Sequence, residues 1–107
     1  MAVGDIIETC FYNNTPGTTS GDLYSGASSG YIACITSILF TNSNSAAKYV
    51  TITFDEKNGF YHFQLPAKSV YQWSGLFVLT AGKKIQGIQE TASAINVNVC
   101  GYIKQVS

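Results

Sequence analysis

Apolar residues recur at every second position along much of this chain, and no stretch has the spacing of an amphipathic helix. In the segment 48–54, Val50, Ile52 and Phe54 fall on one side of an extended backbone. The segment 94–104 repeats the pattern, with Ile95, Val97, Val99 and Ile103 on one face and the uncharged residues Asn96, Asn98, Cys100 and Tyr102 on the other. Such alternation is typical of half-buried β-strands, so we predict an all-β protein.

Turn-forming residues separate the alternating segments about every ten residues, which favours an antiparallel β-sandwich or jelly roll over an α/β fold. With 107 residues the chain suits a single domain, so we expect one β-sandwich over 1–107. About seven to eight strands are expected. Their predicted ranges are 5–12, 31–39, 49–55, 60–65, 69–72, 76–79, 85–89 and 95–104.

A turn signal separates two of the alternating segments. Asn58 and Gly59 are the residue types that best tolerate the positive φ of a tight hairpin turn. We therefore predict a hairpin with its turn at this pair. Beyond the turn, the alternation predicts Tyr61 and Phe63 in the core and His62 on the opposite face.

The segment 31–40 is apolar on both sides of a regular strand. A strand of this kind lies in the centre of a sandwich or under a neighbouring subunit, because monomers avoid large exposed apolar patches. Its two predicted faces are Ile32, Cys34, Ile38 and Phe40 on one side and Tyr31, Ala33, Ile35 and Leu39 on the other.

The stretch 13–30 differs from the rest of the chain in being rich in Gly, Ser and Thr. Only Leu23 and Tyr24 are substantial apolar anchors within it. Loops of this length are uncommon inside compact domains, so we predict an arm that packs on another chain. Simple disorder is the alternative.

Charge is scarce, because only 11% of the residues are charged and six lysines balance six acids without any arginine. This composition lacks the basic surface that binds phosphates, so we expect no nucleic-acid partner. No apolar run is long enough to cross a membrane, and we expect the protein not to bind a membrane. Residues 1–5 also lack the basic and apolar segments of a signal peptide.

The sequence offers little for catalysis, metal binding or cofactor binding. His62 is the single histidine, no serine has the context of a nucleophile turn, and the acids are scattered. We predict no enzyme, no metal site and no cofactor. Cys10, Cys34 and Cys100 are predicted to be buried thiols, with a Cys34–Cys100 disulfide as the alternative.

Aromatic residues make up 13% of the chain and are the remaining functional signal. On an outer face they can stack on sugar rings or anchor a protein interface. Glycan sites add carboxylates and amides beside the ring, whereas assembly surfaces are neutral, so the low charge favours assembly. The predicted interface residues are Tyr31, Ile35, Leu39, Tyr49, Tyr71, Trp73, Tyr102, Leu23 and Tyr24.

The chain carries a series of short motifs at Asp22 to Ser25, Ile35 to Asn42, Tyr49 to Ile52, Leu65 to Val70, Trp73 to Leu76, Val78 to Ile85 and Thr91 to Tyr102. The order of these motifs along residues 22–103 resembles that of small β-sandwich virion proteins of tailed bacteriophages. Lys83 and Lys84 depart from that pattern, because an acidic residue usually follows the Ala-Gly turn there.

The resemblance implies a virion structural protein, either a capsid decoration (cement) protein or a neck, tail or fibre component, with no catalytic residue to transfer. Decoration of the head by a homo-oligomer, a trimer being favoured, is the leading expectation, with the major capsid protein among its partners. Such a protein is located in the virion and assembles in the cytoplasm of the host bacterium. A glycan-binding module at a fibre tip, using Trp73 and nearby tyrosines, is the alternative.

Overall fold

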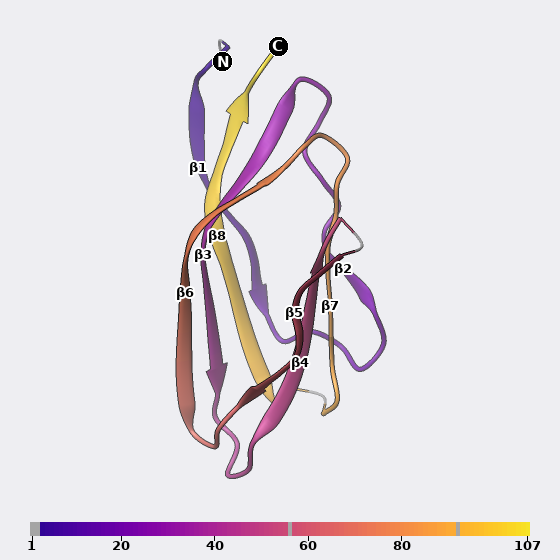
Figure 1. Ribbon diagram of the computed structural model, residues 1–107, viewed down its shortest axis with the longest axis vertical. Coiled ribbons are helices and arrows are strands. Elements are labelled where there is room, and N and C mark those ends of the chain that lie inside the picture. Colours follow the sequence, from indigo (N-terminus) through magenta and orange to yellow (C-terminus); the bar gives the residue numbers. More distant parts are fainter. Residues whose placement is uncertain (1–2, 56, 92) are drawn as a thin grey trace.

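The computed structural model describes residues 3–55, 57–91 and 93–107, and in these residues the chain forms eight β-strands in two packed four-stranded sheets (Figure 1). The first sheet has the strand order β1-β8-β3-β6, and the second has the order β2-β7-β4-β5. The strands are β1 (Ile6–Asn14), β2 (Gly21–Tyr24), β3 (Tyr31–Asn42), β4 (Lys48–Phe54), β5 (Lys57–Leu65), β6 (Ser69–Leu79), β7 (Ile85–Gln89) and β8 (Ile95–Gln105).

The strand pairing is that of a jelly roll. β1 pairs with β8, β2 with β7, β3 with β6 and β4 with β5, and every pair is antiparallel. Each sheet is completed by one further antiparallel pair, β3 with β8 and β4 with β7. The prediction of an all-β antiparallel sandwich or jelly roll is confirmed.

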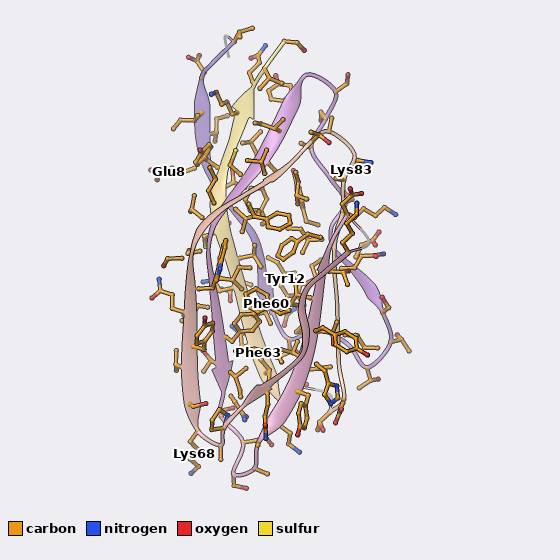
Figure 2. All side chains as sticks on the ribbon, in the orientation of Figure 1. Glu8, Tyr12, Phe60, Phe63, Lys68 and Lys83 are labelled. Carbon is orange, nitrogen blue, oxygen red and sulfur yellow. The ribbon has the colours of Figure 1, made fainter. Side chains whose placement is uncertain are left out.

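The core lies between the two sheets and contains the residues that alternation assigned to it. Val97 and Val99 of β8 and Val50 and Ile52 of β4 are buried, and their neighbours along each strand are more exposed. Tyr12, Phe60 and Phe63 also project into the space between the sheets (Figure 2).

A β-bulge in β3 explains why this strand is apolar at both odd and even positions. The register shifts between Ile35 and Ser37 against both β6 and β8. One extra residue reverses the alternation, so Ile35 before the bulge and Ile38 after it face the same core. Ile35 is 0% exposed within the single chain, so its prediction as an interface residue is wrong.

The β4–β5 hairpin is present, but its turn is not at Asn58 and Gly59. β4 ends at Phe54 and β5 begins at Lys57, so these two residues belong to β5. A Cβ atom at Gly59 would overlap the Phe54 ring, so glycine is needed here for packing space. A second bulge follows in β5, and it places Tyr61 outside with 73% of its surface exposed, which contradicts its predicted core position.

The stretch 13–30 is not one continuous loop. β1 continues to Asn14, and β2 forms from Gly21 to Tyr24. Pro16 is buried, and its carbonyl accepts a hydrogen bond from the side chain of Gln89. These contacts hold part of the stretch on its own chain, and residues 17–22 within it are exposed.

Candidate interaction surface

Five of the exposed large apolar side chains lie on β6, an edge strand of the sandwich, and the other five, Val3, Ile6, Ile7, Tyr61 and Val106, are exposed elsewhere. β6 is the last strand of the first sheet and pairs only with β3, so its other edge is unpaired among the described strands (Figure 1). Val70 and Leu76 are 62% and 60% exposed, and Val78 is 48% exposed. We call this the β6 surface, and it consists of Val70, Tyr71, Leu76, Phe77 and Val78.

A hollow of about 180 Å³ opens between β6 and β5, the edge strands of the two sheets. The side chains that line it are apolar or aromatic, and Trp73 and Phe60 meet there edge to face with ring centroids 6.4 Å apart. Phe77 of the β6 surface also contributes to the wall. We call it the edge cleft, and it is lined by Ile38, Phe54, Gly59, Phe60, Trp73 and Phe77.

A cluster of charged side chains lies at one end of this region. Asp55 forms ion pairs with both Lys57 and Lys83, with nitrogen–oxygen distances of 3.5 Å in each case. These charged groups lie beside Phe77 and Val78 in a neighbouring hollow. The β6 surface itself carries no charged side chain, as expected for the centre of a protein interface.

Two of the predicted interface residues lie at this edge. Tyr71 is partly exposed, and its ring contacts Phe63 at a centroid distance of 5.1 Å. Trp73 is half-buried in the wall of the edge cleft and does not form a platform on an outer face. Its predicted position on an outer face is therefore wrong, because its ring packs against the core.

The other predicted interface residues are distributed over the molecule. Leu39 and Tyr102 are half-buried in the first sheet and are not among the residues that pack on the core. Leu23, Tyr24 and Tyr31 are half-buried against the core. The structure therefore does not gather the nine predicted residues into one surface.

Sequence reasoning missed Val70, Leu76 and Val78, which dominate the β6 surface. The apolar run 76–79 was visible, but it was assigned to a separate strand. In the structure the predicted strands 69–72 and 76–79 are a single strand, β6. The position of β6 at the edge depends on the order of strands in the sheet. The one signal in the sequence for an exposed apolar surface was a run of apolar residues without alternating polar ones.

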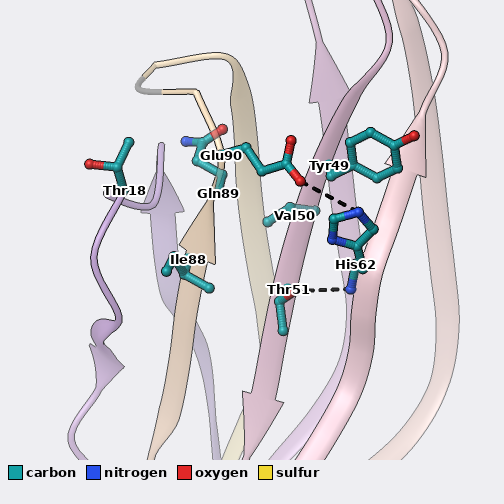
Figure 3. A pocket seen from close by; sticks show the side chains of 8 residues that line it. All are labelled: Thr18, Tyr49, Val50, Thr51, His62, Ile88, Gln89 and Glu90. Carbon is teal, nitrogen blue, oxygen red and sulfur yellow. Dashed lines mark hydrogen bonds and ion pairs between the residues drawn. The ribbon is translucent and has the colours of Figure 1, made fainter.

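A second hollow, of about 310 Å³, lies on the second sheet and is more polar (Figure 3). The rings of Tyr49 and His62 stack there with centroids 4.2 Å apart. His62 Nε2 lies 3.4 Å from a carboxylate oxygen of Glu90, and the His62 main-chain N–H donates to the Thr51 hydroxyl at 2.9 Å. The bulge in β5 gives His62 a φ of +49°.

The second hollow combines an aromatic ring, an imidazole, a carboxylate and, from Gln89, a residue with an amide side chain. The Gln89 side chain already forms hydrogen bonds within the chain, donating to the carbonyl of Pro16 and accepting from the main-chain N–H of Ile95. The hollow therefore offers polar groups beside Tyr49 but no activated nucleophile.

The described part of the chain holds no group of three or more His, Cys, Asp or Glu side chains arranged to bind a metal ion. Nor do these residues include a helix long and apolar enough to span a membrane.

A scan against models of known protein families gives no match to this chain, and a search of curated proteins gives none either. Function is therefore inferred from the surfaces described above.

Proposed function

We propose that this chain is a structural protein of a bacteriophage virion that associates with itself and with other virion proteins through its β6 edge. Decoration of the capsid as a trimer, in contact with the major capsid protein, is its role in this proposal. Use as a tail, neck or fibre component would require the same surface. The single observation that carries the proposal is the run of exposed apolar residues on an unpaired edge strand.

An edge of this kind favours association for two physical reasons. The unpaired main-chain groups of β6 can hydrogen-bond to another strand, and natural monomers usually protect such edges with charges or prolines. β6 contains neither. Its exposed side chains also form an apolar area that is stabilised when water is excluded from it.

The edge cleft gives this association a means of recognition. It is apolar and open beside β6, so a side chain from a neighbouring molecule can insert next to Trp73 and Phe77. Closed symmetry around an axis would bring one such edge from each copy to its neighbour.

The proposed site of assembly is the bacterial cytoplasm, and the finished protein is located in the virion. The three cysteines are free thiols, which is compatible with assembly in a reducing compartment. Fold by itself does not assign this role, since jelly rolls serve many functions.

Light scattering coupled to size-exclusion chromatography tests the proposal. The wild type is expected to form a trimer, and Leu76→Lys combined with Val78→Lys is expected to be monomeric with an unchanged circular dichroism spectrum. Val3→Lys combined with Ile7→Lys is the matched control, because it places the same two charges at exposed apolar residues away from β6. A wild type that stays monomeric at high concentration and does not bind phage particles would refute the proposal.

Glycan binding is a second candidate function, and the hollow around Tyr49 and His62 favours it. There a carboxylate from Glu90 lies beside stacked rings, the combination that sugar recognition uses. A glycan array probed with wild type, Tyr49→Ala and Glu90→Gln tests it. Binding by the wild type and its loss in both variants is expected; absence of binding by the wild type refutes this candidate.

A further inference from the structure

Two of the three cysteines lie directly opposite each other on neighbouring strands. Cys10 of β1 and Cys100 of β8 are register partners in the antiparallel pairing of the first sheet. Both thiols donate to the same acceptor, the side-chain oxygen of Asn98, with distances of 3.3 Å from Cys10 Sγ and 3.0 Å from Cys100 Sγ. The two sulfurs therefore point to one place on the outer face of the sheet.

This arrangement is close to the geometry of a disulfide. Opposed residues in an antiparallel pair have Cβ atoms about 4.5–5.5 Å apart, and only a small adjustment brings them to the roughly 3.5–4.5 Å that a disulfide needs. Cys10 is exposed, and Cys100 is partly exposed in the same surface hollow. An oxidant in solution can therefore reach the pair.

The third cysteine is placed differently. Cys34 is buried. In the pairing of β3 with β8 it lies opposite Tyr102, whereas Cys100 lies opposite Ser37. Hydrogen bonding with Cys34 raises the pKa of the Tyr102 hydroxyl, so this thiol already has a partner. The geometry thus points to a pair different from the Cys34–Cys100 bridge that we considered as the alternative from the sequence.

We infer that Cys10 and Cys100 are a reversible oxidation site that forms a cross-strand disulfide when the protein meets a small-molecule disulfide such as oxidised glutathione. The bridge joins β1, which is the edge strand opposite β6, to β8. It covalently fixes this edge, because β1 pairs with no other described strand in the sheet.

The chemistry proceeds in two balanced exchanges. The Cys10 thiolate attacks one sulfur of oxidised glutathione, which forms a mixed disulfide and releases one glutathione thiolate. Cys100 then gives up its proton to solvent and its thiolate attacks the Cys10 sulfur, which closes the protein disulfide and releases the second glutathione thiolate; both glutathione thiolates take up a proton from solvent. In sum, two protein thiols are oxidised and one glutathione disulfide is reduced to two thiols.

The order of attack follows from the surroundings of the two thiols. Desolvation by burial, followed by the neighbouring Cys10 thiol, raises the pKa of Cys100. Burial therefore makes Cys100 the less reactive of the two thiols, and the more exposed Cys10 encounters the oxidant first.

Mass spectrometry of the native protein after incubation with oxidised glutathione tests the inference. The wild type is expected to lose two hydrogens and to yield one linked peptide containing Cys10 and Cys100. Cys100→Ser is expected to stop at a glutathione adduct on Cys10. Cys34→Ser is the matched control and should form the same bridge as the wild type.

Thermal unfolding gives a second readout, since the oxidised wild type is expected to melt at least about 5 °C above its reduced form, and Cys100→Ser is expected to show no such rise. A bridge that maps to Cys34, or a wild type that retains glutathione on both Cys10 and Cys100 without closing, would overturn the inference. The Cys100→Ser adduct remains informative even if Cys34→Ser does not fold.

Discussion

The side-chain amide of Asn42 donates to the main-chain carbonyl of Leu65 at 3.1 Å, and this hydrogen bond connects the two sheets of the sandwich. Asn42 ends β3 in the first sheet, and Leu65 ends β5 in the second. The same amide also donates to the carbonyls of Ala46 and Pro66, while the side-chain oxygen accepts from the main chain of Asn44. One buried asparagine therefore satisfies several main-chain groups at this end of the fold.

We predict that Asn42→Ala lowers the free energy of unfolding by about 2–3 kcal/mol, because it leaves buried main-chain groups without hydrogen-bond partners. Urea unfolding followed by circular dichroism measures the loss. Asn13→Ala is the control, since its exposed side chain is expected to contribute less than about 0.5 kcal/mol. Equal losses in the two variants would contradict this account of Asn42.

Gly101→Ala is predicted to be more severe and to destabilise the protein by about 3 kcal/mol or more. A Cβ atom at this position would overlap the main-chain oxygen of Cys34, beside the bulge in β3. Neither strand can move away without losing its pairing. Thermal unfolding checks this prediction.

Gly17→Ala is the comparison for this substitution, because an added Cβ atom there would meet its nearest neighbour at 3.7 Å. It is expected to melt within a few degrees of the wild type. A similarly small change for Gly101→Ala would show that β3 and β8 do not constrain each other as closely as the structure indicates.

Asp22 makes a pH-dependent contribution to stability. A hydrogen bond from Gln86 at 2.8 Å, with a further contribution from Lys84 at 3.4 Å, lowers the pKa of this carboxyl below its ordinary value of 3.8. Because the folded-state pKa is the lower one, the stabilisation is present above pH 3.8 and is lost as the pH falls through the folded-state value.

Asp22→Asn removes the charge with little change of shape. We predict that the wild type unfolds at higher urea concentration than this variant at pH 7, and that the difference shrinks below pH 3.8. Urea titrations at several pH values measure it. A difference that stays constant down to pH 2 would exclude the carboxylate as its source.

Trp73 is the single tryptophan of the chain and lies in the wall of the edge cleft, so its fluorescence reports on association through β6. Burial of the cleft by another copy removes water from the ring. We predict that the emission shifts to shorter wavelength as protein concentration rises, in parallel with the mass from light scattering. Leu76→Lys combined with Val78→Lys should keep the long-wavelength emission at all concentrations.

The prediction from sequence was best where a strand keeps regular alternation. Val97 and Val99 of β8 were assigned to the core because strict alternation places them on one face, and the structure agrees. Ile35 and Tyr61 were misplaced because each lies near a bulge. A bulge is defined by the pairing of two strands, so a single strand's sequence does not contain it.

The candidate site was predictable only in part, for a related reason. Tyr71 was among the residues predicted for an interface, and it does lie on the β6 surface. Val70, Leu76 and Val78 were not, because an apolar strand has the same composition whether it is central or at an edge. Only the order of strands places it at the rim.

Local chemistry along the chain, namely side-chain alternation and turn residues, determined that this protein would be an antiparallel β-sandwich, because these properties act between residues close in sequence. Tertiary structure decided which strand became the exposed edge and which cysteines came to face each other. These outcomes depend on pairing between distant segments, as when residue 10 meets residue 100 across β1 and β8.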